Sequence, residues 1–115
     1  MTPEQLSSGA LRIDFAGMPW QQVRPGVRHK VYREGSRQLR LVEFDTSDGV
    51  ADWCQVGHIG YVLAGGLNID VNGSILQFAA GDGLFIPPGS VTQHRPVTIE
   101  PGTRLLMVED LDMEE

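Results

Sequence analysis

The stretch from Leu67 to Phe78 constrains the fold more than any other, because it predicts a β-hairpin. Its first half alternates apolar with polar residues, which is the period of a strand with one buried face. Asn72-Gly73 then interrupts the alternation, and both residues tolerate the positive φ angles of a two-residue hairpin turn. The second half returns with Leu76 and Phe78 available to the core. A chain with this hairpin is expected to build antiparallel sheet.

Strand and turn signals of the same kind recur along most of the chain. Further strands are predicted at 27–33, 39–44, 53–63, 84–86 and 104–108. Fourteen glycines and seven prolines punctuate the sequence, and no long segment has the 3.6-residue period of an amphipathic helix. Only the N-terminus predicts a helix, a short one in which Thr2 caps the first turn and Pro3 follows. The predicted fold class is therefore all-β, a sandwich or barrel with a short N-terminal helix.

The length of the chain predicts one domain with a modest core, because 115 residues do not suffice for two. We expect the core to span about 36–110, after an N-terminal extension of residues 1–35. Residues 109–115 form a predicted acidic tail that contains five of the fifteen acidic residues. Most of the net charge of −6 is therefore expected to be solvated in that tail.

Composition argues against several classes of protein. The basic residues are scattered instead of forming a stripe, so no nucleic-acid partner is expected. No apolar run approaches the roughly 20 residues that span a bilayer, so no membrane partner is expected either. The N-terminus lacks the basic-then-apolar pattern of a signal peptide, and the single cysteine, Cys54, excludes an intramolecular disulfide framework. These features predict a cytoplasmic location.

Few side chains in this sequence support demanding chemistry. They are Cys54, the carboxylate of Asp52 and the histidines His29, His58 and His94. Alternate side chains of an extended strand share one face, so Asp52, Cys54 and His58 would point the same way. Cysteine, histidine and carboxylate side chains are ligands for Zn²⁺, Fe²⁺ and related ions. His29 comes early in the chain and belongs to no motif, so it is expected at the surface or an interface.

Two stretches resemble the cupin superfamily, in particular a small single-domain cupin of the cupin-2-like conserved-barrel type. Gly57 to Gly65 reads G-H-I-G-Y-V-L-A-G and is similar to the end of the first cupin motif. Gly81 to Gly89 reads G-D-G-L-F-I-P-P-G and is similar to the start of the second. The resemblance covers about residues 40–110. It implies a double-stranded β-helix, or jelly-roll barrel, of the kind that often holds a metal inside.

The usual metal ligands of cupins are replaced in this chain. The two histidine positions of the first motif fall on Asp52 and Cys54, and its glutamate position falls on His58. The histidine position of the second motif falls on Thr92, with His94 two residues further on. A displaced ligand set for a divalent transition metal (Zn, Fe, Mn or Ni), made of Asp52, Cys54, His58 and His94, stays open on the chemistry of these residues, although no family motif specifies it.

The interior of such a barrel holds one small ligand at its mouth. We expect apolar walls from Val62, Leu76, Phe85 and Ile86 around a few polar groups, which suits a small polar molecule. Two functions stay open at this point. The first is a small-molecule-binding cupin that holds its ligand through a divalent metal, with the reaction, if any, undetermined. The second is a metal-free cupin that binds or senses a metabolite without catalysis.

Structural roles stay open as well. Cys54 can serve as a small buried hydrophobe, and His58 as a hydrogen-bonded residue inside the barrel. A purely structural dimer module with a filled cavity is a further alternative. Homodimers are common among such barrels, and residues 10–33, with Trp20, Pro25 and Val31, are expected to extend across a partner subunit.

Overall fold

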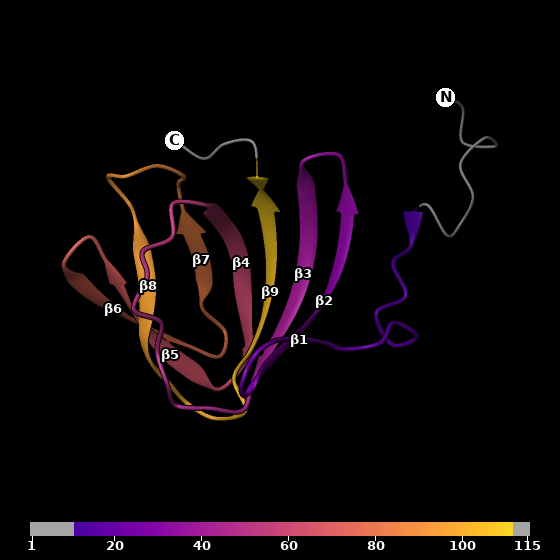
Figure 1. Ribbon diagram of the computed structural model, residues 1–115, viewed down its shortest axis with the longest axis horizontal. Helices are drawn as coiled ribbons and strands as arrows, with labels where there is room; N and C mark the ends of the chain where they lie inside the picture. The colour runs from indigo at the N-terminus through magenta and orange to yellow at the C-terminus, as the bar shows by residue number, and fades with distance from the viewer. Residues whose placement is uncertain (1–10, 112–115) are drawn as a thin grey trace.

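The computed structural model describes residues 11–111, in which its elements are strands (Figure 1). They are β1 (Gln21–Arg24), β2 (Val27–Glu34), β3 (Arg37–Phe44), β4 (Gly57–Ala64), β5 (Gly66–Val71), β6 (Ser74–Ala79), β7 (Gly83–Ile86), β8 (His94–Ile99) and β9 (Arg104–Asp110). The predicted helix at Thr2 and Pro3 and the last four residues of the acidic tail lie outside the described residues. Within 11–111, no helix is long and apolar enough to cross a bilayer.

The strands form two antiparallel sheets with the hydrophobic core between them (Figure 1). The large sheet has the order β1-β2-β3-β9-β4-β7, and the small sheet has the order β6-β5-β8. Strand β9, the last in the chain, thus lies between β3 and β4. The prediction of an all-β fold is confirmed.

The register of the large sheet determines which side chains face the small one. Val42 of β3 lies opposite Leu105 of β9, and Leu105 lies opposite Val62 of β4. These three residues are at most 3% exposed, so this face of the sheet is the inner one. Four residues further along the same two strands, Glu109 of β9 lies opposite His58 of β4. Because side chains alternate along a strand, this pair also lies on the inner face.

Two turns depend on glycine, and the second of them confirms the predicted hairpin. Gly65 has a φ of +72° between β4 and β5, and there the chain passes from the large sheet to the small one. A Cβ at Gly65 would clash with the side chain of Thr103, so no other residue fits this crossing. Asn72 and Gly73, with φ of 47° and 99°, join β5 to β6 as a two-residue hairpin turn.

Three predicted boundaries are wrong. Strands β1 and β2 belong to the large sheet, and Val27 of β2 is 3% exposed in the core, so residues 21–34 are no extension. Glu109 is in β9 and 2% exposed, so the solvated tail does not begin there. The strand expected to begin at Trp53 begins at Gly57. The residues before it form no strand and meet β8 through isolated bridges and a few further hydrogen bonds.

Two of the four predicted wall residues do not line the interior. Leu84 and Ile86 of β7 are buried, whereas Phe85 between them is 76% exposed on the outer face. Alternation along a strand requires this, because neighbouring side chains point to opposite faces. Leu76 lies on the edge strand β6 and is 45% exposed. Val62 is fully buried, as expected of a core residue.

The segment expected to reach a partner subunit makes contacts within its own chain. The Trp20 ring lies 4.2 Å from the Arg28 guanidinium and 4.6 Å from the Lys30 ammonium. Lys30 Nζ also donates a hydrogen bond to the carbonyl of Phe15 at 2.6 Å. These contacts hold the segment against β2. The homodimer stays a prediction.

Thr103 offers a test of how the two sheets are joined between β8 and β9. Its buried hydroxyl accepts a hydrogen bond from the N–H of Gly66 at 2.9 Å and donates to the carbonyl of Glu100 at 2.6 Å. Thr103→Val keeps the shape but leaves the Gly66 N–H without that acceptor. We expect the free energy of unfolding in urea to fall by about 1–2 kcal/mol.

Thr98→Val is the matched control for this variant. The Thr98 hydroxyl is exposed and accepts a hydrogen bond from the side chain of Asn68 at 2.8 Å. Its loss should change the free energy of unfolding by no more than about 0.5 kcal/mol. Equal losses in the two variants would show that the buried hydroxyl has no special role.

Candidate metal centre

The backbone pairs Cys54 with His94, although Cys54 belongs to no strand. The two residues form an isolated antiparallel bridge, in which the N–H of each donates to the carbonyl of the other at 2.8 and 2.9 Å. In such a pair the Cα atoms lie about 5.5 Å apart and the side chains share a face. His94 begins β8 at the edge of the small sheet. This pairing brings the thiol close to the imidazole.

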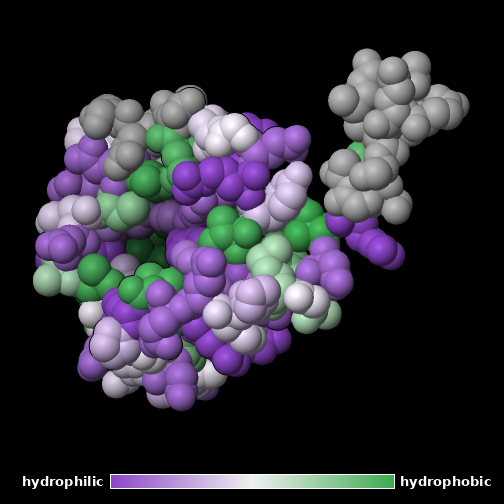
Figure 2. Space-filling model, turned by 45° about the vertical axis from the view of Figure 1, so that its right-hand side comes forward, coloured by the Kyte–Doolittle hydropathy of each residue, from purple (hydrophilic) through white to green (hydrophobic). Residues whose placement is uncertain are grey.

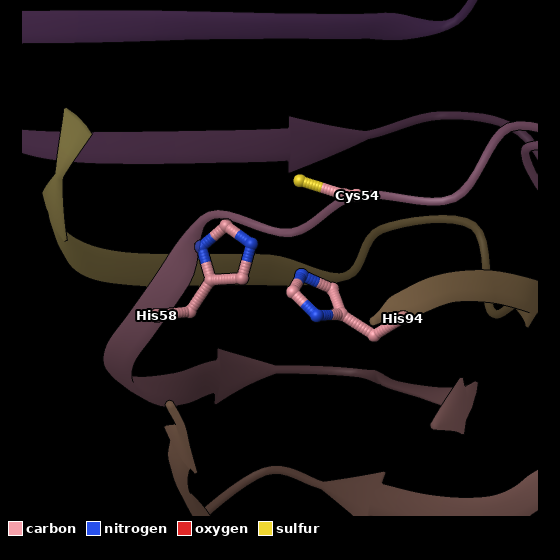
Figure 3. Close-up of side chains that lie close together, drawn as sticks. All are labelled: Cys54, His58 and His94. Atoms are coloured by element: carbon pink, nitrogen blue, oxygen red, sulfur yellow. The ribbon is translucent and has the colours of Figure 1, made fainter. Parts of the chain in front are cut away.

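His58 reaches the same place from the large sheet. Between Cys54 and His58 the chain passes from the edge of the small sheet into β4. The rings of His58 and His94 meet edge to face, with centroids 4.6 Å apart and an interplanar angle of 72°. One ligand atom from each of the three residues lies within 4.8 Å of the other two. Figure 3 shows the three side chains pointing toward one another.

The hydrogen bonding of His94 leaves one ring nitrogen free to bind a ligand. Its Nδ1 lies 3.0 Å from the carbonyl oxygen of Thr92. A carbonyl can only accept, so this contact places the ring proton on Nδ1 and a lone pair on Nε2. Nε2 is buried and has no hydrogen-bond partner in the part of the chain that the structure describes. Metal-binding histidines are typically held in this way, by a carbonyl or carboxylate on the other nitrogen.

A buried carboxylate, Glu109, plays the corresponding role for His58. Oε2 of Glu109 lies 2.7 Å from Nδ1 of His58. The same carboxylate accepts hydrogen bonds from Nε and Nη2 of Arg40, at 2.9 and 2.8 Å, and from Nε2 of Gln38, at 2.6 Å. Both oxygens are therefore engaged by donors, and the side chain is 3% exposed. This arrangement sets a negative charge 2.7 Å from Nδ1 of His58, the kind of carboxylate contact that metal-binding histidines often have.

The charges in this network favour a thiolate at Cys54. Its hydrogen bond to His58 outweighs burial and lowers the pKa of the Cys54 thiol. Burial alone would lower the pKa of His58, but the interactions with Cys54 and Glu109 raise it overall. Burial would raise the pKa of Glu109, yet the contact with His58 and the charge of Arg40 lower it to about 2. The thiolate is the form of cysteine that binds metals.

The analysis of the sequence missed Glu109, Arg40 and Gln38. The signal that could have found Glu109 is the two-residue period of β9, in which Leu105 and Met107 face inward and Glu109 comes next. Its position close to the acidic C-terminus concealed this continuation of the strand. The alternation of β3 likewise places Gln38 and Arg40 on the inner face.

The structure does not bring the fourth predicted ligand into the group. Asp52 is exposed and is not among the residues whose ligand atoms gather near His58. The predicted alignment required one continuous strand from Asp52 to His58, and β4 begins only at Gly57. Thr92, at the usual histidine position of the second motif, donates its hydroxyl to the carbonyl of Pro87 at 2.5 Å.

His29, expected at the surface or an interface, lies half-buried on the inner face of β2. Its Nδ1 is 3.4 Å from Nη1 of Arg40. Burial and the neighbouring guanidinium lower its pKa, so this imidazole is neutral at pH 7. It borders the network around Glu109 without joining the three candidate ligands.

A cavity of about 100 Å³ lies between the sheets beside the two imidazoles. Its polar lining consists of Arg40, His58 and His94, and its other lining residues are apolar. Figure 2 shows a hollow in the surface with hydrophobic residues deep inside it and mostly hydrophilic residues around it. One thiolate and two imidazoles next to a cavity fit a metal bound by three protein ligands with one open position.

The sequence matches no protein-family model and no curated protein. The fold, however, is similar to solved structures. KdgF from Halomonas sp. superposes with a TM-score of 0.71 at 23% identity, over 85% of this chain and 92% of that one. An RmlC-like cupin from Shewanella frigidimarina NCIMB 400 gives a TM-score of 0.70 at 18% identity, over 85% and 87%.

A cupin 2 conserved barrel domain protein from Rhodopseudomonas palustris gives a TM-score of 0.61 at 20% identity, over 90% of this chain and 71% of that one. At these identities the likeness shows the fold and nothing about ligands or reactions. The chain therefore has the cupin fold, and the expectation from Gly57–Gly65 and Gly81–Gly89 is confirmed.

The pKa of Glu109 predicts how stability depends on pH in metal-free protein. The folded state lowers this pKa from 4.5 to about 2, so the carboxylate contributes its full stabilisation above pH 4.5. That contribution, at most about 3 kcal/mol, is lost as the pH falls toward 2. Glu109→Gln should therefore be less stable than wild type at pH 6, with the difference shrinking at lower pH. Urea unfolding of both proteins from pH 6 to pH 3, with a chelator present, measures this difference in the free energy of unfolding.

Glu100→Gln is the control, because Glu100 is exposed and its side chain lies outside the network. Its stability should follow that of wild type at every pH. A difference between wild type and Glu109→Gln that stays constant from pH 6 to 3 would contradict the role given to the carboxylate charge.

Proposed function

We propose that this cupin barrel binds one divalent transition metal ion through Cys54, His58 and His94, and that the ion holds a small polar molecule in the adjoining cavity. The observation that carries the proposal is the buried Nε2 of His94. It has a lone pair and no partner among residues 11–111, and it lies within 4.8 Å of the two other ligand atoms. An unsatisfied buried nitrogen is costly unless a ligand occupies the site.

The donor set selects among the candidate metals. One thiolate and two imidazoles suit Zn²⁺ best, and Fe²⁺ or Ni²⁺ next, since soft sulfur ligands favour these ions. Mn²⁺ prefers carboxylate and water oxygens, and Asp52, which would have supplied an oxygen, is exposed away from the group. Zinc is therefore the first metal to test.

The residues around the site would prepare it for this ion. Glu109 and the Thr92 carbonyl fix the orientation of the two rings, and Cys54 supplies the negative charge. When bound with one position open, such a metal polarises a carbonyl or activates water. The apolar walls of the cavity would keep bulk water from a ligand held there.

A metal-free binding or regulatory cupin remains the second candidate. It is favoured by the replacement of the usual ligand positions with Asp52, Cys54, His58 and Thr92. In that case Cys54 and His58, whose side chains interact with each other, would contact the ligand directly. Metal content separates the two candidates.

Protein purified without chelators and titrated with Zn²⁺ should bind about one equivalent. Cys54→Ser and His94→Ala should each weaken zinc affinity by at least about 100-fold, because even outer-shell partners of a metal ligand contribute about 10- to 100-fold. Competition with a chromophoric chelator, together with elemental analysis, gives both quantities.

Asp52→Asn is the matched control, since it changes a residue of the predicted ligand set that is exposed in the structure. Its zinc affinity should equal that of wild type. Binding of less than about a tenth of an equivalent, or equal losses in Asp52→Asn and His94→Ala, would refute the proposed metal centre.

A further inference from the structure

The cavity beside the candidate metal centre has one charged group whose hydrogen bonds are incompletely used. Arg40 directs Nε and Nη2 at Glu109, at 2.9 and 2.8 Å. Within residues 11–111, the hydrogen-bond contact of its third nitrogen, Nη1, is the one to Nδ1 of His29 at 3.4 Å. A guanidinium has five N–H donors, so donors of Arg40 stay available on a residue that lines the cavity.

The charges around the cavity do not cancel once a metal is bound. Glu109 balances Arg40, and Cys54 would balance half the charge of a divalent ion, because a cysteine binds a metal as the thiolate. His29 is neutral, because burial and Arg40 lower its pKa. The remaining imidazoles of His58 and His94 are neutral as metal ligands. One positive charge is left, and an apolar surrounding makes an uncompensated charge costly.

The size of the cavity limits the ligand. A volume of about 100 Å³ is smaller than the roughly 150 Å³ that accommodates benzene in an apolar protein cavity, so about six non-hydrogen atoms is an upper limit. Walls such as Phe44 and Met107 offer no partner to a second polar group. The body of the ligand must therefore be short and apolar.

From these three limits we propose that the ligand is a small monocarboxylate with a short aliphatic body, bound between the metal and the guanidinium of Arg40. The inference rests on the proposed function, because the metal supplies the excess positive charge. A carboxylate can accept from the donors of Arg40 that Glu109 leaves unused, and one negative charge balances the site. A neutral amide of the same shape lacks the charge, and a dicarboxylate would place its second charge against an apolar wall.

The probes are propionate, its neutral isostere propionamide and the dicarboxylate succinate, titrated by calorimetry into zinc-loaded protein. Zinc binding is measured first, so the result for the metal stands separately from the result for the ligand. We expect propionate to bind at least about tenfold more tightly than either comparison compound, since hydrogen bonds to charged groups are the stronger ones. This comparison uses the wild-type protein and depends on no variant.

Arg40→Lys tests the residue itself while retaining a charge beside Glu109. Measured in protein kept saturated with zinc, it should weaken propionate binding at least about tenfold, because a lysine ammonium lacks the planar array of donors of a guanidinium. Arg37→Met, at an arginine whose side chain is 70% exposed, should leave the affinities for zinc and propionate unchanged.

Equal binding of propionate and propionamide, or unchanged propionate binding in Arg40→Lys, overturns this inference even when zinc binds with full stoichiometry. Failure to bind zinc overturns the metal centre, and the carboxylate inference with it. Zinc binding followed by selective, Arg40-dependent binding of propionate supports both.

Discussion

The site depends on one buried ionic interaction, that between Glu109 and Arg40. Glu109 is a charged residue at the centre of a sheet, and its carboxylate is retained because Arg40, Gln38 and His58 engage both of its oxygens. An unpaired charge in this position would be strongly destabilising. The pair places a negative charge beside the ring of His58 and holds Arg40 where it lines the cavity.

The second constraint is the path of the chain between the sheets. The backbone pairing of Cys54 with His94 belongs to the edge of the small sheet, whereas His58 and Glu109 belong to the inner face of the large one. The three residues Gln55, Val56 and Gly57 join these positions, so the thiol and both imidazoles are held by backbone on both sides of the cavity. Cys54 thus reaches the candidate metal centre without being on a strand.

The sequence predicts those parts of the fold and of the candidate site that depend on neighbouring residues in the chain. The hairpin at Asn72-Gly73 depends on two adjacent turn residues and was predicted correctly. The grouping of Cys54, His58 and His94 was predicted from the chemistry of these residues, yet the assumed strand from Asp52 was wrong, because isolated bridges leave no periodic pattern. Glu109 was missed for a different reason. The partners that keep it charged and buried lie on β3 and β4, and only the sheet order brings them together.

The claim that three side chains from two sheets share one ion is tested most directly by X-ray absorption at the zinc edge of zinc-loaded protein. The account predicts one sulfur at about 2.3 Å and two imidazole nitrogens at about 2.0–2.1 Å, with the sulfur lost in Cys54→Ser. A shell of oxygen ligands without sulfur would contradict it.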